Sequence, residues 1–149
     1  MEDRKYEALK LKNHLCFPLY ACSRETIRLY KPLLDRLDLT YTQYITMLVL
    51  WEQGASTVKS LGNALYLDSG TLTPLLKKLE AKGLLDRNRS TEDERNLIVS
   101  LTPKGLAMRE QAVDVQAQMA KTVRLSPEEA LTLYKLLYKL LGVDIDGAD

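Results

Sequence analysis

Two cysteines and one histidine are the residues of this chain best suited to redox or metal chemistry. They stand close together as His14, Cys16 and Cys22 in a sequence of 149 residues. Two cysteines are too few for a disulfide-stabilised scaffold, and a single histidine with them does not make the four-ligand set of a usual zinc site. We therefore expect no metal and no cofactor. What remains is the chemistry of one thiol, which is a nucleophile in its thiolate form.

The spacing of the two cysteines excludes a disulfide between them within one helix. From Leu9 to about Leu34 the apolar residues recur at the helical period. Six residues place Cys22 ~9 Å along the axis from Cys16 and about 120° round it, whereas a disulfide needs Cα atoms within ~7 Å. Cys22 can pair across a dimer, but such a residue is more often a small buried hydrophobe. On a regular helix His14 points about 160° away from Cys16, so we expect it to face solvent.

A second group of residues has the side chains needed to contact DNA. A helix expected after Asp68 buries a stripe of four leucines, and its opposite face carries no acid. Backbone amides at its N-terminus can bind a phosphate, threonines can approach base edges or thymine methyls, and lysines can contact phosphates. Such a helix suits a major groove. The leucines are Leu72, Leu75, Leu76 and Leu79, and the candidate DNA-binding residues are Ser69, Gly70, Thr71, Thr73, Lys77 and Lys78.

A hairpin is expected directly after this helix. Alternating residues in Leu84–Arg89 and Leu97–Leu101 predict two strands around a charged tip. Arginine at a hairpin tip can enter a minor groove. We expect Asp93 to pair with Arg95 and to hold its guanidinium in place. The candidate DNA-binding residues of this wing are Arg87, Arg89, Asp93 and Arg95.

Capping signals locate the other helices. Thr40 to Gln43 form a capping box that opens a helix ending at Gly54, and this helix is apolar nearly all round, as in a core. Ser56 or Thr57 caps a short helix that forms a helix-turn-helix with the next one. Thr102-Pro103 and Ser126-Pro127 start two more helices.

The order of these elements predicts a winged helix. A helix-turn-helix followed at once by a hairpin gives a mainly α fold with a small β-hairpin wing. In the first helix we expect Pro18 to kink the chain or displace the first turn, and Pro32 to end or bend the helix.

Overall charge argues at first sight against a nucleic-acid binder, because the formal net charge is only +1. The net charge of the whole chain conceals an uneven distribution of charge along the sequence. Residues 77–89 carry five bases and two acids, whereas residues 126–149 carry two bases and five acids. The longest apolar run, Ile45 to Trp51, is far short of the ~20 residues that span a bilayer. The N-terminus shows no signal-peptide core, so we expect a cytoplasmic protein without a membrane span.

The motifs now described resemble the MarR family of winged-helix repressors, in its organic-hydroperoxide-sensing branch. Residues 66–80 (YLDSGTLTPLLKKLE) carry the resemblance, together with Arg89-Ser90 and Asp93-Glu94-Arg95. Leu15-Cys16-Phe17, Leu19-Tyr20-Ala21, Leu39-Thr40-Tyr41 and Gln43-Tyr44 are also similar to that branch. The resemblance spans roughly Leu9 to Gly105. It implies a homodimer on a pseudopalindromic operator in double-stranded DNA. Residues 39–102 are then the winged helix-turn-helix and residues 1–38 and 103–149 the helical dimerisation region, in one continuous domain.

The resemblance also implies a redox site at Cys16. It implies that Tyr30 and Tyr41 hydrogen-bond the sulfur and that Phe17 and Tyr20 line the pocket. On a continuous helix Tyr30 lies ~21 Å from Cys16 along the axis, so the tyrosine must come from the partner subunit. A hydroxyl donating to sulfur favours the thiolate, and tyrosines give a largely apolar pocket suited to an organic hydroperoxide. With no distal cysteine in the sequence, a small-molecule thiol is expected to capture the sulfenic acid.

Three other interpretations stay open. Cys16 can be structural, in a MarR-type repressor that is released by a reversibly bound phenolic or other small ligand. The winged helix can bind protein instead of DNA. A thiol peroxidase ranks last, because no arginine or threonine is obviously placed beside Cys16 to activate a peroxide. We therefore expect a regulator and not an enzyme.

Overall fold

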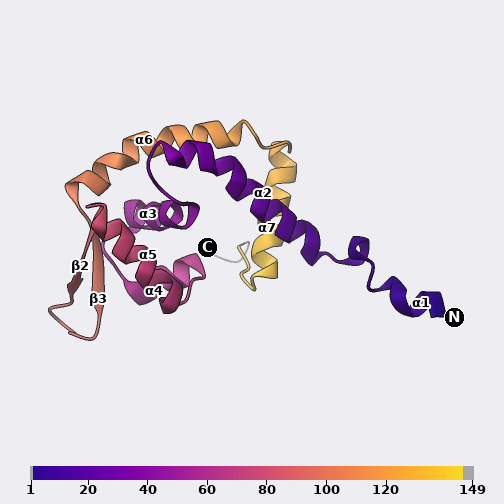
Figure 1. Cartoon of the computed structure of the whole chain (residues 1–149), viewed down its shortest axis with the longest axis horizontal. Coiled ribbons are helices and arrows are strands. Elements are labelled where there is room, and N and C mark those ends of the chain that lie inside the picture. The colour runs from indigo at the N-terminus through magenta and orange to yellow at the C-terminus, as the bar shows by residue number, and fades with distance from the viewer. Residues whose placement is uncertain (1, 146–149) are drawn as a thin grey trace. The chain divides into compact units, whose positions relative to one another are not determined.

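A computed structural model describes residues 2–145 of the chain (Figure 1). The expected fold class, mainly α with a small β wing, is confirmed. The helices are α1 (Glu2–Glu7), α2 (Cys16–Asp35), α3 (Tyr41–Gln53), α4 (Val58–Leu65), α5 (Ser69–Ala81), α6 (Pro103–Ala120) and α7 (Pro127–Leu140), with a 3-10 turn, η1 (Leu11–Asn13). The strands are β1 (Ser56–Thr57), β2 (Leu85–Arg89) and β3 (Leu97–Leu101).

The long first helix begins later than expected and ends close to the expected position, about Leu34. α2 begins at Cys16 and not at Leu9, so Pro18 falls in the first turn, where a missing N–H leaves no helical hydrogen bond unmade. Pro32 does not end the helix, which continues to Asp35. His14 precedes α2 and is exposed. We expected His14 to be exposed on the side of a helix opposite Cys16. It is exposed, but it lies in the short segment between η1 and α2.

The predicted capping box at the start of α3 is present. Thr40 Oγ1 accepts from the Gln43 N–H at 3.3 Å, and Gln43 Oε1 accepts from the Thr40 N–H at 3.1 Å. Gly54, with φ +76°, ends the helix as expected. The prediction that α3 is buried nearly all round is wrong for one side, because Leu48 is 40% exposed. That side borders the groove described below.

α4 and α5 form the expected helix-turn-helix, and Figure 1 shows them beside α3 and next to the β2–β3 hairpin. Thr57 caps α4 by accepting from the Ser60 N–H at 3.0 Å. Tyr66 ends α4 in the left-handed region with φ +55°. All four leucines of the predicted stripe on α5 are buried. Their burial fixes which face of α5 remains open to a partner.

The sheet has one strand more than expected. Its order is β1-β3-β2, all antiparallel, with Arg87 opposite Val99 on one side of β3 and Ser56 opposite Val99 on the other. β1 has two residues, which is too short for an alternating pattern to reveal. β2 therefore forms one edge of the sheet.

α6 begins where Thr102-Pro103 predicted it, with Thr102 Oγ1 accepting from the Gly105 N–H at 3.0 Å. Gly105 fits tightly here, because a Cβ at this position would lie 1.9 Å from the Leu84 carbonyl oxygen. The Gly105 carbonyl accepts a hydrogen bond from Trp51 Nε1 at 2.9 Å. These contacts join α6 to α3 and to the start of β2.

The described residues form two compact units, which divide after Ala117, within the residues of α6. In the second unit α7 starts where Ser126-Pro127 predicted it, and Ser126 and Glu129 form a capping box there. Among residues 2–145 the helices are too short or too polar to cross a membrane.

Candidate functional site

The open face of α5 carries the residues expected to contact DNA. Thr73 is half-buried, and the others are exposed: Ser69, Gly70, Thr71, Lys77 and Lys78. Because the leucines of the opposite face pack into the core, these side chains and the first-turn amides point away from the fold. The arrangement combines hydroxyls near the helix start with ammonium groups one to two turns later.

Asp68 caps α5 and holds its first turn. Its carboxylate accepts from the Thr71 N–H at 2.8 Å and from the Thr71 hydroxyl at 3.3 Å. The backbone hydrogen bond from Thr71, chiefly, lowers the pKa of Asp68 below its usual value. Asp68 is therefore ionised at neutral pH, and it orients a threonine proposed to face DNA.

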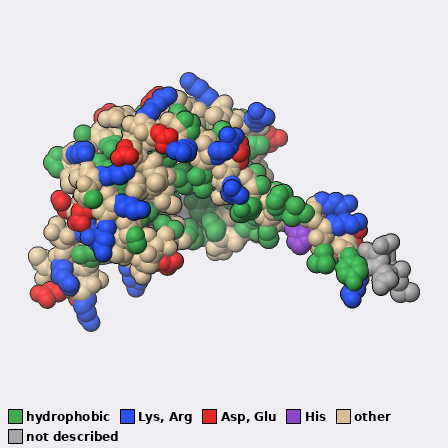
Figure 2. Space-filling model, in the orientation of Figure 1, with side chains coloured by type: hydrophobic (Ala, Val, Ile, Leu, Met, Phe, Trp, Pro, Cys, Tyr) green, Lys and Arg blue, Asp and Glu red, His purple; other side chains and the backbone are tan. Residues whose placement is uncertain are grey.

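The hairpin tip contains the expected ion pair. Arg95 Nε donates to Asp93 Oδ1 at 3.2 Å, and the Arg95 N–H donates to the same oxygen at 3.0 Å. Arg89 Nη1 donates to the Glu94 carbonyl at 2.9 Å. The Arg95 side chain is 91% exposed, and Figure 2 shows acidic and basic side chains together at this tip. The hydrogen bonds to Asp93 thus orient the exposed Arg95 side chain at the tip.

Arg87 has a different environment from the other wing arginines. Its side chain is only 17% exposed and binds Glu80 of α5. Arg87 is therefore held between the helix and the hairpin, whereas Arg89 and Arg95 lie on the exposed hairpin.

Cys16 is exposed at the first position of α2, the end of a helix at which negative charge is stabilised. Phe17 and Tyr20, its expected pocket neighbours, are 44% and 57% exposed. Figure 2 shows hydrophobic side chains gathered along the start of α2. This end of α2 thus presents an exposed apolar surface with a thiol in it.

Tyr30 and Tyr41 lie together, as the resemblance implied, and Tyr44 joins them. The Tyr30 ring lies 5.1 Å from that of Tyr41 and 5.7 Å from that of Tyr44. The Tyr30 hydroxyl donates a long hydrogen bond of 3.5 Å to Gln116 Oε1 on α6. Burial chiefly, and then the neighbouring Tyr44 and Tyr41, raise the pKa of Tyr30 to about 12. Burial also raises the pKa of Tyr41 and of Tyr44.

The structure does not bring the tyrosines to Cys16 of the same chain. α2 runs without interruption from Cys16 past Tyr30, so the two residues are ~21 Å apart along its axis. Cys22 is also exposed. The expectation that it is a buried hydrophobe is therefore wrong within the single chain.

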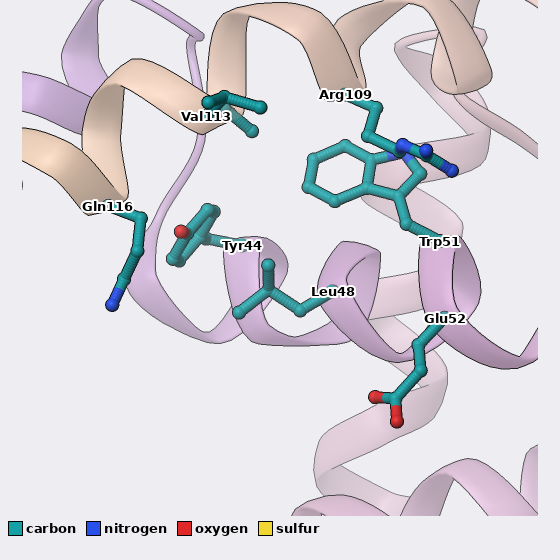
Figure 3. Close-up of a pocket in the computed structure, with 8 residues that line it drawn as sticks. Tyr44, Leu48, Trp51, Glu52, Arg109, Val113 and Gln116 are labelled. Atoms are coloured by element: carbon teal, nitrogen blue, oxygen red, sulfur yellow. The ribbon is translucent and has the colours of Figure 1, made fainter.

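A groove lies beside the tyrosine cluster, between α3 and α6. Its volume is about 530 Å³. Figure 3 shows Tyr44, Leu48 and Trp51 of α3 facing Arg109, Val113 and Gln116 of α6, with Glu52 at one side. The residues that line the groove are mainly apolar, and Arg109 contributes a positively charged side chain.

Sequence reasoning missed four residues of these sites: Tyr44, Glu80, Gln116 and the groove residue Arg109. Tyr44 could have been found, because it lies one turn after Tyr41 on a helix and so shares its face. The other three could not, since their roles depend on contacts between distant elements.

Three comparisons with known proteins agree. The sequence model of the SarA/Rot transcriptional regulators matches residues 28–111. The organic hydroperoxide resistance transcriptional regulator of Bacillus subtilis is 50% identical over 139 residues, which cover 93% of this chain and 95% of that protein. A MarR variant from E. coli, solved with operator DNA, is 30% identical with a TM-score of 0.75, over 85% of this chain and 93% of that chain.

The chain belongs to the MarR family of winged-helix transcriptional regulators. Another MarR-like structure is AbfR of Staphylococcus epidermidis, which is 35% identical with a TM-score of 0.77, over 93% of this chain and 95% of that chain. AbfR has been solved bound to DNA in reduced and in overoxidized form, and separately with a disulfide formed. Membership of the MarR family identifies a regulator and not an enzyme.

Proposed function

We propose that this protein is a homodimeric DNA-binding repressor that leaves its operator when an organic hydroperoxide oxidises Cys16. One observation carries the proposal: α2 holds the exposed thiol at its start and a tyrosine cluster near its other end. Neither end is a complete site in a single chain. Two chains that pair their α2 helices can bring Cys16 of one to Tyr30 and Tyr41 of the other. The protein then acts in the cytoplasm, on a gene for peroxide resistance.

The tyrosines supply hydrogen-bond donors for the thiolate. Because their pKa values are raised, their hydroxyls stay protonated at neutral pH. A donor to sulfur favours the charged, nucleophilic form. Phe17 and Tyr20 extend the apolar surface around the thiol, which suits the organic part of a hydroperoxide.

The oxidation proceeds in two balanced steps. The thiolate attacks the outer peroxide oxygen and the O–O bond breaks. The leaving alkoxide takes a proton to become an alcohol, while the sulfur keeps one oxygen as sulfenic acid. A small-molecule thiol then attacks the sulfenic sulfur, forming a mixed disulfide and releasing water.

The winged helix binds the operator in this proposal. Ser69, Gly70, Thr71 and Thr73 approach bases and phosphates in the major groove, and Lys77 and Lys78 contact phosphates. Arg89 and Arg95 reach the minor groove, with Asp93 orienting Arg95. A dimer presents two such units to the two halves of a pseudopalindrome.

A gel shift on the DNA upstream of the protein's own gene tests the proposal, with and without cumene hydroperoxide. The wild type should bind when reduced and lose its affinity sharply on oxidation. Cys16→Ser should bind and stay bound. The matched control is Cys22→Ser, which removes the other exposed thiol of α2 and should respond as the wild type does. A Cys16→Ser protein that is released equally well would refute the role of Cys16.

The groove between α3 and α6 favours a second candidate, a repressor released by a reversibly bound ligand. Its volume of about 530 Å³ suits a small aromatic molecule, and Arg109 is a cation for a carboxylate. In that case a phenolic acid should release DNA from the fully reduced Cys16→Ser protein. The redox proposal expects no such release.

A further inference from the structure

The carboxylate of Glu80 on α5 accepts hydrogen bonds from three N–H groups of Arg87 on β2. Glu80 Oε2 accepts from Arg87 Nη2 at 2.8 Å and from Nε at 3.2 Å. Glu80 Oε1 accepts from the backbone N–H of Arg87 at 3.3 Å. The hydrogen bonds from the Arg87 side chain, chiefly, lower the pKa of Glu80.

This contact sits where the hairpin would otherwise be free to move against the helix. β2 is an edge strand, because the order is β1-β3-β2, and its outward N–H groups have no strand partner. Glu80 occupies one of them. It lies one turn beyond Lys77 and beside the leucines that seat α5 in the core. Two guanidinium N–H groups that converge on one carboxylate oxygen therefore join the candidate DNA-reading helix to the first strand of the wing.

Two features argue against Arg87 as a direct phosphate contact. Its side chain is 17% exposed, against 91% for Arg95 at the tip. In addition, Nε and one terminal nitrogen already bind a carboxylate whose removal would leave a half-buried charge without its partner.

We propose that Glu80 and Arg87 are a positioning pair that sets the angle between the wing and α5, so that helix and wing engage their two grooves together. The inference rests on the proposed DNA binding. It assigns Arg87 to the fold of the DNA-binding surface and makes an acid, Glu80, a requirement for binding to the operator.

Whether Glu80→Gln weakens or strengthens operator binding distinguishes two roles of Arg87, a direct phosphate contact and a positioning contact. If Arg87 contacts a phosphate, then removing the negative charge of Glu80 should leave DNA binding unchanged or strengthen it. If the pair positions the wing, Glu80→Gln should weaken operator binding by about tenfold, as expected for the loss of a charge-assisted hydrogen bond. Binding to non-specific DNA should not weaken, because no phosphate contact is lost.

Arg87→Lys gives a second, charge-neutral comparison. A lysine can still neutralise a phosphate, but its single ammonium group cannot replace the two guanidinium N–H groups that bind Glu80. The positioning role therefore predicts that Arg87→Lys and Glu80→Gln weaken operator binding similarly and that the double variant is no worse than either. The matched control is Glu92→Gln, which removes an exposed acid at the hairpin tip and should not weaken binding.

The experiment measures operator and non-specific affinity of these variants by fluorescence anisotropy, and amide hydrogen exchange of each free protein. Faster exchange confined to the β2–β3 hairpin in Glu80→Gln, with operator binding lost, supports the proposal. Unchanged exchange, additive effects, or tighter operator binding by Glu80→Gln overturns it. If the wild type shows no sequence-specific binding, the proposed function fails, and the exchange measurement still tests the pair.

Discussion

The hydroxyl of the half-buried Tyr30 stays protonated far above neutral pH, because its pKa is raised to about 12. This shift links the residue to stability. The pKa of Tyr30 is higher in the folded protein than its usual value of 10.0, so its contribution to stability is complete below pH 10. It is lost as the pH rises from about 10 to about 12.

We expect a tyrosinate absorbance titration of the wild type to show a late phase that Tyr30→Phe lacks. The chain has eight tyrosines, so the comparison with Tyr30→Phe isolates the contribution of this one. Identical alkaline titrations of wild type and Tyr30→Phe would contradict the burial described for this hydroxyl.

At the level of elements, the close approach of α6 to the segment before β2 makes a sharp prediction for Gly105. An alanine Cβ would overlap the Leu84 carbonyl oxygen at 1.9 Å. Alanine is also the better helix former, so any destabilisation must come from this overlap. We expect Gly105→Ala to lower the free energy of unfolding by about 2–3 kcal/mol, as measured by urea denaturation.

The control lies two residues further along the same helix. Ala107 is exposed on α6, and Ala107→Gly should cost about 1 kcal/mol through helix propensity alone. If Gly105→Ala is as stable as the wild type, the first turn of α6 is not packed against Leu84 as described.

Elements with local signals could be predicted from the sequence. The capping boxes at Thr40 and Ser126, and the cap at Thr102, each mark a helix start that the structure has. These signals work because the cap and the N–H it satisfies are only two or three residues apart. The spacing of the leucines in α5 likewise predicts correctly which face of the helix is buried.

Features that depend on tertiary contacts could not be predicted. β1 forms only because Ser56 and Thr57 meet β3, some forty residues away in the sequence. The helix continues through Pro32, although proline there removes one helical hydrogen bond. Arg87 is a residue type that commonly contacts DNA, so the sequence predicted that role for it. Only the folded structure shows that its side chain binds Glu80. The candidate redox site was inferred from the family resemblance, and it remains a prediction.

On the scale of the whole molecule, a site shared between chains can be tested by mixing two inactive variants. In a heterodimer of Cys16→Ser with Tyr30→Phe, one shared site carries both changes and the other carries neither. If Cys16 pairs with the partner's Tyr30, this heterodimer should have one site that reacts with hydroperoxide at the wild-type rate. The measurement is the rate of thiol loss in purified, differently tagged heterodimers.

If each site lay within one chain, the same heterodimer would contain no intact site and would react only at the slow rate of Tyr30→Phe. The Tyr30→Phe homodimer provides that rate. Wild-type kinetics in a Tyr30→Phe homodimer would instead remove Tyr30 from the reaction.

The ion pair at the wing tip has a consequence for how a regulator finds its operator in a chromosome. The tip, Ser90 to Asn96, carries three acids and one base, and Asp93 already holds the guanidinium of Arg95. Such a tip has little general attraction to a polyanion, so arbitrary DNA retains the protein only briefly. If Arg95 enters the operator as proposed, the ordered arginine should lose little conformational freedom on binding. The proposed wing contact should therefore lower the affinity for every DNA sequence and increase the difference in affinity between the operator and the rest of the genome.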